Sequence, residues 1–329
     1  MYKGYFKLKR NPFDLTPDPV CFVPTQRHNE ALAALYYGVR QRKGFVVLTG
    51  EVGTGKTLLL RCLLGLLKES EDIGYAYLFN GRLTPTEFLQ YIVADFGLPA
   101  AGKTKYELLL TLGKLLVARG KKGMTTVLIV DEAHHLSAEI LEEVRLLSNL
   151  ETTTDKLLQI VLVGQPELDE KLDSFELRQL KQRIAVRTQL GPLTLAETKR
   201  YIERRLEIAA GDTQPAAVFP EATIAAVHRH SKGLPRLINT ICENALMAAY
   251  ARQVPIVTPD IIEYVAGELR LNVVSSTNGK STNGSGEMDV KRAINVLVDL
   301  FLSLQEAAAG NKSTGSPMPV GVSEHEPYI

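Results

Sequence analysis

The most chemically specific stretch of the sequence is a run of eight residues that begins at Gly50. It matches the pattern G-x-x-x-x-G-K-[ST] of a phosphate-binding loop, and its members are Gly50, Glu51, Val52, Gly53, Thr54, Gly55, Lys56 and Thr57. In such a loop the backbone N–H groups and the start of the following helix surround the phosphates of a nucleotide. We therefore expect the loop backbone and the Lys56 ammonium to bind phosphate, and the Thr57 hydroxyl to ligate Mg²⁺.

Two acids follow a second apolar run, and their chemistry complements that of the loop. Residues 126–130 are apolar or β-branched throughout, which indicates a buried strand, and Asp131 and Glu132 come directly after them. An acid at the end of such a strand can hold Mg²⁺ beside a phosphate loop, and the next acid can polarise an attacking water. We expect Asp131 to share the metal with Thr57 and Glu132 to be the catalytic base.

Gln165 and Arg236 are candidates for sensing the terminal phosphate. Gln165 follows the apolar run 160–163, and a polar residue at this strand tip can contact the γ-phosphate or orient the water; the alternative is a strand cap with its amide in solvent. Arg236 follows a Gly-Leu-Pro sequence, and proline suits the first turn of a helix. We expect the Arg236 guanidinium to contact the γ-phosphate of the same chain, so that hydrolysis would move the helical part.

Four basic residues lie just before and inside the fifth predicted strand, namely Arg178, Lys181, Arg183 and Arg187. A guanidinium from this region can reach a nucleotide on a neighbouring subunit, and such a finger in trans is worth about 10³–10⁵ in turnover. We favour Arg183 for this role and Arg178 second. The alternative is a solvated basic helix end.

His134 and His135 follow the two acids closely. Adjacent residues on a helix do not face each other, so we do not expect this pair to bind a metal. The sequence from Asp131 to His134 also spells the box of one helicase group. Those enzymes need two tandem motor domains, and the single phosphate loop of this chain disfavours that interpretation.

The elements that must position these residues alternate between strands and helices up to position 192. Five strands are predicted, at 45–49, 75–79, 127–130, 160–163 and 184–188, with helices between them. This alternation favours an α/β fold in which a parallel sheet is covered by helices on both faces, in three αβα layers. Ligands bind such sheets at the carboxyl ends of the strands, where the phosphate loop and the two acids fall.

The sequence predicts two folded domains. A helix at 29–42 and the alternating region form a nucleotide-binding domain over 29–192. Thr194 and Glu197 then have the spacing of a capping box, and a small all-helical lid follows over 193–271. Its predicted helices are 195–209, 220–230, 234–251 and 259–271.

The two ends of the chain differ in composition from the middle. Residues 1–28 are predicted to be an N-terminal arm, and its segments Asn-Pro-Phe (11–13) and Thr-Pro-Asp-Pro (16–19) cannot form regular helix. Residues 272–288 are rich in Ser, Gly and Asn and predict a flexible linker. Apolar residues then recur at steps of four and three, which predicts an amphipathic helix over 289–309 that either folds back on the body or binds a partner. Residues 310–329 are expected to be a disordered tail.

Composition limits the remaining functional classes. With 329 residues, 45% of them apolar, the chain can fill a large core, and its net charge of +1 does not by itself indicate nucleic acid as a partner. The three cysteines lack metal-binding spacing and fit buried, reduced thiols. The sequence has no secretion signal and no transmembrane segment, since no run reaches the roughly 18–20 apolar residues that a span needs. We expect a cytoplasmic protein.

Together these motifs resemble those of the AAA+ ATPases. The features that carry the resemblance are the phosphate loop, the acid pair, the polar strand tip, the arginines before the fifth strand and the Gly-x-Pro-Arg of the lid. Further segments are similar to the type-A general secretion pathway ATPases, to ATPases that accompany exosortase and exopolysaccharide gene clusters and, more loosely, to ATP-dependent regulators of Tn7-like transposition. These segments are 11–13, 16–19, His28, 42–57, 163–168 and 234–239.

The resemblance, which covers residues 1–271, implies an enzyme that hydrolyses ATP with Mg²⁺ at the subunit interfaces of a homo-oligomer, either a ring or a filament. It implies that the enzyme drives or regulates an envelope secretion or exopolysaccharide export system. The secretion members usually continue into a membrane helix and a peptidoglycan-binding region, which this sequence lacks. We therefore expect any envelope role to pass through a partner at the inner membrane, reached by the helix Val290–Ala308.

Two other functions stay open at this point. One is an ATP-dependent regulator of transposition that binds duplex DNA, for which basic residues such as Lys3, Lys7 and Lys9 would be available. The other is a scaffold that binds nucleotide and never turns it over. The presence of both acids together with Lys56 and Arg183 argues against the scaffold.

Overall fold

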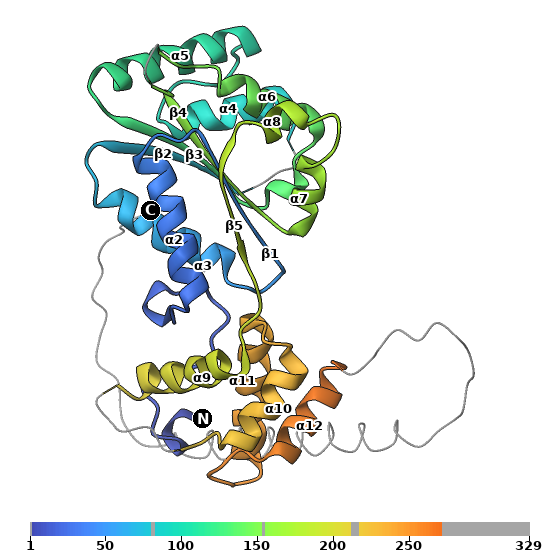
Figure 1. Ribbon diagram of the computed structural model, residues 1–329. Coiled ribbons are helices and arrows are strands. Elements are labelled where there is room, and N and C mark those ends of the chain that lie inside the picture. The colour runs from blue at the N-terminus through green and yellow to red at the C-terminus, as the bar shows by residue number, and fades with distance from the viewer. Residues whose placement is uncertain (1, 80–82, 153–154, 212–216, 272–329) are drawn as a thin grey trace, which may run out of the picture. The chain divides into compact units, whose positions relative to one another are not determined.

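The computed structural model describes residues 2–79, 83–152, 155–211 and 217–271 (Figure 1). The predicted linker at 272–288, helix at 289–309 and tail at 310–329 lie outside these residues. Within the described ranges, no helix is both long enough and apolar enough to cross a membrane.

Five parallel strands form one sheet in the spatial order β2-β3-β4-β1-β5 (Figure 1). They are β1 (Phe45–Gly50), β2 (Ile73–Leu78), β3 (Thr125–Val130), β4 (Leu158–Gly164) and β5 (Ile184–Leu190). The three middle strands are buried along their whole length, as continuous apolar runs in a parallel sheet should be. The predicted α/β fold with a parallel sheet is confirmed, although each strand differs from its predicted bounds by one or two residues at one or both ends.

Two layers of helices cover the sheet. One layer holds α2 (Gln26–Arg40) and α3 (Lys56–Lys68), and the other holds α4 (Pro85–Asp95), α5 (Lys105–Lys121), α6 (Ala138–Leu147), α7 (Pro166–Leu172) and α8 (Arg178–Lys181). Val46 and Leu48 of β1 pack with the first layer, and Phe45 and Val47 pack with the second. Because successive side chains of a strand point to opposite faces, one apolar strand fills both interfaces.

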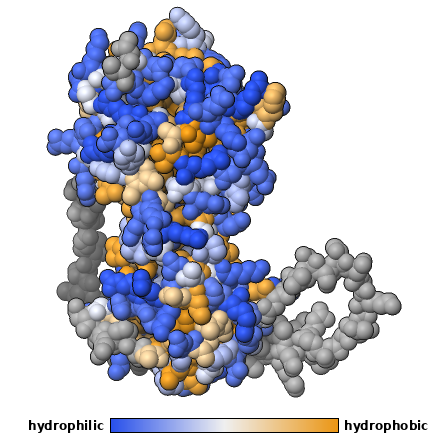
Figure 2. Space-filling view, in the orientation of Figure 1, coloured by the Kyte–Doolittle hydropathy of each residue, from blue (hydrophilic) through white to orange (hydrophobic). Residues whose placement is uncertain are grey.

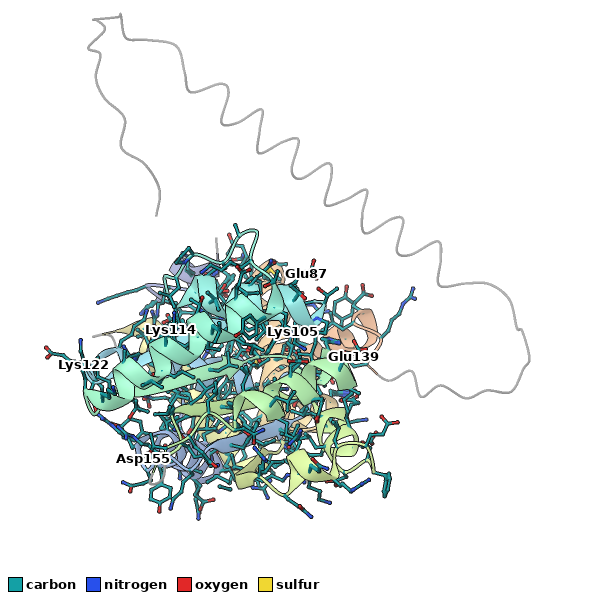
Figure 3. The ribbon with its side chains drawn as sticks, turned by 90° about the horizontal axis from the view of Figure 1, so that it is seen from above. Glu87, Lys105, Lys114, Lys122, Glu139 and Asp155 are labelled. Carbon is teal, nitrogen blue, oxygen red and sulfur yellow. The ribbon has the colours of Figure 1, made fainter. Side chains whose placement is uncertain are left out.

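The outer surface of the second helix layer is charged. Lys105 and Lys114 of α5 and Lys122, which caps it, are exposed and lie on the outside of the layer (Figure 3). In the view of Figure 2, hydrophilic residues cover most of the face, with apolar residues scattered between them. The helices of this layer turn their apolar sides inward, where they fill the core above the sheet.

Helix α2 begins earlier than its predicted start at Asn29. Its first residue is Gln26, and Thr25 is the N-cap, with its side chain accepting a hydrogen bond from the backbone N–H of His28. A threonine that satisfies an unpaired N–H in the first turn is a common helix start. The predicted start was wrong because the apolar periodicity begins only at Ala31, nearly two turns after the cap.

Among the described residues, four helices follow β5, and we call them the lid. They are α9 (Leu195–Ala210), α10 (Glu221–Ser231), α11 (Pro235–Ala251) and α12 (Pro259–Glu268). The predicted capping box is present, since Thr194 accepts from the backbone of Glu197 and the Glu197 carboxylate accepts from the backbone of Thr194. These four helices share one apolar core.

The N-terminal arm completes that lid core. Its short helix α1 (Tyr2–Tyr5) lies against α11, and Phe6, Leu8 and Phe13 are buried among lid residues. The ring of Phe13 meets that of Phe219 edge to face at 5.8 Å. The arm therefore packs as part of the lid, although the whole nucleotide-binding domain separates the two in sequence.

The cysteines are free thiols. Cys21 and Cys242 are buried, as expected, and Cys62 is half-buried on α3. Burial raises the pKa of all three thiols, so they stay protonated and unreactive.

Candidate nucleotide-binding site

The phosphate loop turns tightly between β1 and α3. Gly53 and Gly55 have φ angles of +81° and +99°, which lie in the left-handed region that favours glycine. Gly50 is needed for a different reason, because a Cβ there would lie 2.8 Å from the backbone O of Leu190 on β5. The loop conformation thus depends on the glycines of the motif.

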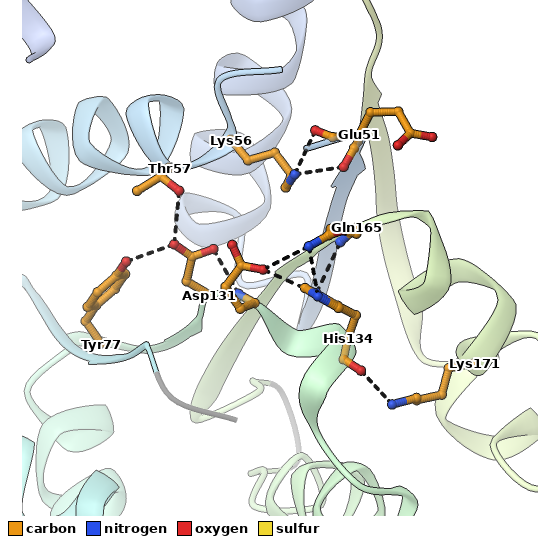
Figure 4. Close-up of polar contacts among 10 residues, drawn as sticks. Glu51, Lys56, Thr57, Tyr77, Asp131, His134, Gln165 and Lys171 are labelled. Carbon is orange, nitrogen blue, oxygen red and sulfur yellow. Dashed lines mark hydrogen bonds and ion pairs between the residues drawn. The ribbon is translucent and has the colours of Figure 1, made fainter. Parts of the chain in front are cut away.

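Lys56 lies against the backbone of its own loop. Its side chain is buried, and its Nζ donates to the carbonyl oxygens of Gly50 at 2.7 Å and Glu51 at 3.0 Å (Figure 4). Burial lowers the pKa of Lys56, and the neighbouring acids Glu132 and Asp131 oppose that shift. The ammonium is held where a phosphate on the loop would be within its reach.

Asp131 is the centre of a hydroxyl cluster at the end of β3. The hydroxyls of Thr57 and Tyr77 donate to its Oδ2 at 3.4 and 3.1 Å, and the backbone N–H of Glu132 donates to its Oδ1 at 2.9 Å (Figure 4). Burial raises the pKa of Asp131. A threonine hydroxyl beside a carboxylate is an all-oxygen donor set, which is what Mg²⁺ prefers, so the two predicted ligands fit that ion.

Tyr77 was not predicted as a site residue. It lies on β2, which pairs with β3, and its partner in the register is Ile129, two residues before Asp131. Burial and then the nearby Asp131 charge raise the pKa of Tyr77, so its hydroxyl keeps the proton that it donates. The sequence could have indicated this role, because Tyr77 lies near the end of the predicted strand that pairs with the strand before Asp131.

Glu132 is held in an unusual backbone conformation. Its φ angle is +52°, in the left-handed region that non-glycine residues adopt rarely and often at functional sites. Its Oε2 lies 3.4 Å from His134 Nδ1 and 3.5 Å from Gln165 Nε2. The candidate base is therefore next to the candidate sensor, as the order of the strands predicts.

Gln165 does not end in solvent. Its Nε2 is 3.0 Å from His134 Nε2, and its backbone N–H donates to His134 Nδ1 at 3.4 Å. We expected His134 and His135 not to face each other, and this expectation was wrong. The two residues lie in a short 3₁₀ helix, Ala133–His135, and their ring centroids are 4.0 Å apart. His134 packs beside the base and the sensor (Figure 4).

Arg236 of the lid touches the phosphate loop through its backbone. Its N–H donates to the carbonyl oxygen of Gly53 at 3.2 Å, and a Cβ on Gly53 would lie 2.7 Å from the Cβ of Arg236. The Arg236 side chain is exposed and lines the same cavity as the loop. The backbone of Arg236 thus joins helix α11 to the phosphate loop.

A cavity of about 360 Å³ joins these groups. One wall comes from the sheet and includes Lys56, Thr57, Glu132 and Gln165. The opposite wall comes from the arm and the lid, and we call it the strap-lid wall, where the strap is residues 12–18. Its members include Asp14, Leu15, Thr16, Pro17, Asp18, Tyr201, Arg205, Arg236 and Asn239.

Arg205 holds the strap in place. It is buried on α9, and its guanidinium donates to the backbone oxygens of Pro12 at 2.5 Å and Asp14 at 2.9 Å. From the other domain, Arg61 of α3 donates to the backbone oxygen of Pro17. Sequence reasoning missed both arginines, because neither belongs to a local motif.

The two candidate finger arginines lie away from this cavity. Arg183 is half-buried and donates to the backbone oxygen of Arg145 at 3.4 Å and to Ser148 Oγ at 2.5 Å. Arg178 is exposed, and its guanidinium stacks 3.9 Å above the ring of Phe175. Neither arginine lines the cavity of its own chain. A residue that acts on the nucleotide of a neighbouring subunit does not need to line its own cavity.

Comparisons with known proteins agree with this geometry. The AAA domain family matches residues 39–172. The general secretion pathway protein A of Aeromonas hydrophila is 46% identical over 253 residues, which are 77% of this chain and 45% of that protein. The ATP-dependent target DNA activator B of Escherichia phage Mu is 25% identical over 232 residues, 66% of this chain and 70% of that protein.

Among solved structures, Cdc6p of Pyrobaculum aerophilum superposes with a TM-score of 0.59 at 20% identity, covering 78% of this chain and 70% of that one. The fold and the phosphate loop are those of AAA+ P-loop proteins, as the match of residues 39–172 to the AAA domain family also indicates. The chain is similar in sequence to general secretion pathway protein A, and it spans less than half of that protein's length.

Proposed function

We propose that this protein binds ATP with Mg²⁺ in the cavity and hydrolyses it. The observation that carries the proposal is the convergence of five residues at the carboxyl ends of three neighbouring strands. Lys56, Thr57, Glu132 and Gln165 line one wall of the cavity, and Asp131 lies behind them in contact with Thr57. This is the arrangement that phosphoryl transfer to water requires: a cation for the phosphates, oxygen ligands for a metal, and a base.

Each residue has a distinct role in this proposal. The loop N–H groups and Lys56 bind the phosphates, and Thr57 and Asp131 hold Mg²⁺, which when bound neutralises charge on the phosphate oxygens. Glu132 accepts the proton of the attacking water. Gln165, 3.5 Å from that carboxylate, orients the water, and Arg236 contacts the γ-phosphate from the lid.

Glu132→Gln and Lys56→Ala together test the enzymatic proposal. Glu132→Gln should keep ATP affinity and lose turnover by a factor of about 10³ or more, because the amide cannot accept the proton. Lys56→Ala should lose binding itself. Equilibrium binding of a fluorescent ATP analogue and steady-state phosphate release measure the two effects. Hydrolysis by Glu132→Gln at a rate near that of the wild type would show that the base is another residue.

We further propose that the active form is a homo-oligomer, a ring or a filament, in which one subunit supplies an arginine to the next. The exposure of Arg178 supports its candidacy, whereas Arg183 would first have to release Arg145 and Ser148. Mixing Glu132→Gln subunits with Arg178→Ala or Arg183→Ala subunits tests this. Activity should recover in mixtures only for the arginine that acts in trans, because the intact arginine of a Glu132→Gln subunit then completes the site of a neighbour that keeps Glu132.

The pathway that we propose is assembly or regulation of an envelope secretion or exopolysaccharide export system, with the protein reaching the inner membrane through a partner. The relation to general secretion pathway protein A supports secretion. The predicted helix Val290–Ala308 is the segment that we expect to bind the partner. Deleting it should leave hydrolysis intact and release the protein from membrane fractions in cells.

ATP-dependent regulation on duplex DNA is the second candidate, because relatives in phages Mu and D108 are target DNA activators. Co-sedimentation with duplex DNA, with and without ATP and at two salt concentrations, separates the candidates. Binding that needs ATP and weakens steeply with salt would favour the DNA function, since contacts to phosphates release counterions.

A further inference from the structure

His28 is a buried residue beside the phosphate loop that the proposed mechanism does not use. It lies in the first turn of α2 with 6% of its surface exposed, outside the set of residues that line the cavity. Its Nε2 is 3.2 Å from the carbonyl oxygen of Thr54, inside the loop. A Cβ on Gly55 would lie 3.4 Å from the same nitrogen, so the ring packs directly against the loop backbone.

The hydrogen bonds of His28 fix which nitrogen carries the proton. A carbonyl oxygen can only accept, so Nε2 must donate to Thr54. The other nitrogen, Nδ1, is 2.7 Å from Thr25 Oγ1, and in a neutral ring it accepts the hydroxyl proton. Thr25 Oγ1 still accepts from the backbone N–H of His28 at 3.3 Å, so every group in the chain of bonds is matched. Burial lowers the pKa of His28, which agrees with the neutral ring.

This bond determines the direction of a phosphate-loop N–H group. Thr54 O and Gly55 N belong to one peptide unit, and in a trans peptide the C=O and the N–H point in opposite directions. Since the carbonyl points to His28, the Gly55 N–H points away from His28. Gly55 lines the cavity, and its N–H has no acceptor among the described residues.

We propose that His28 is a positioning residue that, by binding Thr54 O, aims the Gly55 N–H at a phosphate in the cavity. The inference rests on the proposed nucleotide binding. The hydrogen bond from Nε2 also polarises the peptide, so the N–H becomes a stronger donor to an anion. The ring itself is fixed from behind by Thr25, the N-cap of α2, and by the edge of Phe22 at 5.8 Å. The first turn of α2 therefore shapes the phosphate site without touching the nucleotide.

Two amides of different length test the proposal at one position. The terminal nitrogen of His28→Gln reaches about as far as Nε2 and can donate to Thr54, whereas that of His28→Asn reaches only as far as Nδ1. His28→Gln should bind a fluorescent ATP analogue within about threefold of wild type, and His28→Asn and His28→Leu should bind about tenfold more weakly, the ratio expected for one hydrogen bond. Thermal unfolding of each variant shows whether it is folded.

The outcomes separate this inference from the proposed function. If wild-type protein binds no ATP, the proposed function fails. If wild type binds and folded His28→Leu binds equally well, or if His28→Gln is as weak as His28→Asn, only the inference fails, because His28 then merely fills space. A measurement without substitutions is the ¹⁵N spectrum of the histidine side chains: a proton on Nε2 of His28 is expected, and a proton on Nδ1 alone would overturn the assignment.

Discussion

The two walls of the nucleotide cavity are assembled in different ways. On the sheet wall, Lys56, Glu132 and Gln165 each follow the end of a strand, and neighbouring strands bring them together. On the strap-lid wall, Asp14 is held by Arg205, which is 191 residues away in sequence. The first wall is fixed by the register of a buried sheet, and the second by contacts between distant parts of the chain.

This difference suggests a division of labour. The sheet wall carries the Lys56 ammonium, the Glu132 carboxylate and the polar Gln165, and its strands are fully buried, so it holds reacting groups in fixed positions. The strap-lid wall combines the strap with Tyr201, Arg205 and Asn239 of the lid, and hydrogen bonds from Arg205 and Arg61 to the strap backbone hold it in place. Substitutions of Glu132 and Gln165 on the sheet wall should therefore change turnover, and those of Arg205 and the strap on the strap-lid wall should change affinity and stability.

Gln165→Ala should have the largest effect among the variants that probe this division. Removing a polar group that acts only on the attacking water should lower turnover about a hundredfold and change ATP affinity less than about threefold. Single-turnover hydrolysis and equilibrium binding measure the two quantities. Gln179→Ala, on the exposed side of α8, is the matched control. If Gln165→Ala lost as much ATP affinity as turnover, the proposal that the sheet wall acts in turnover and the strap-lid wall in binding would be contradicted.

Arg205→Met should have an intermediate effect, and it should lower stability and ATP affinity instead of turnover. It removes two hydrogen bonds from a buried guanidinium to the strap, so the free energy of unfolding should fall by about 2–3 kcal/mol, and ATP affinity should fall about tenfold. Urea unfolding and nucleotide binding measure these changes. Arg204→Met alters an exposed arginine on the same helix and should change neither. Wild-type affinity in folded Arg205→Met would mean that the strap does not enclose the nucleotide.

Tyr77→Phe should have the smallest effect and refine the description of the sheet wall. The ring stays, but Asp131 loses a donor at 3.1 Å, so the carboxylate is less well oriented toward Mg²⁺. The Mg²⁺ concentration that gives half-maximal nucleotide binding should rise about threefold. Tyr75→Phe, two residues earlier on β2, is the control. An unchanged Mg²⁺ requirement would assign Tyr77 a packing role only.

The sequence predicted the sheet wall far better than the strap-lid wall, and the physical reason is locality. The strands and the groups at their tips follow from short apolar runs and from glycine spacing, which are visible within about ten residues. Tyr77, His28 and Arg205 act through tertiary contacts, with Asp131, Thr54 and the strap respectively. Their roles depend on which segments meet, and local periodicity carries no such information.

The arm that completes the lid core has a consequence for synthesis. Tyr2, Phe6, Leu8 and Phe13 leave the ribosome long before the lid does, but most of the apolar surface that covers them belongs to Leu193 and later residues. Until α11 has emerged, these apolar side chains lack most of their native contacts. The sheet domain must therefore fold while the arm is still exposed to solvent. Translation that stops before α11 would therefore release a fragment with exposed apolar side chains, and we expect chaperones or proteases to recognise it.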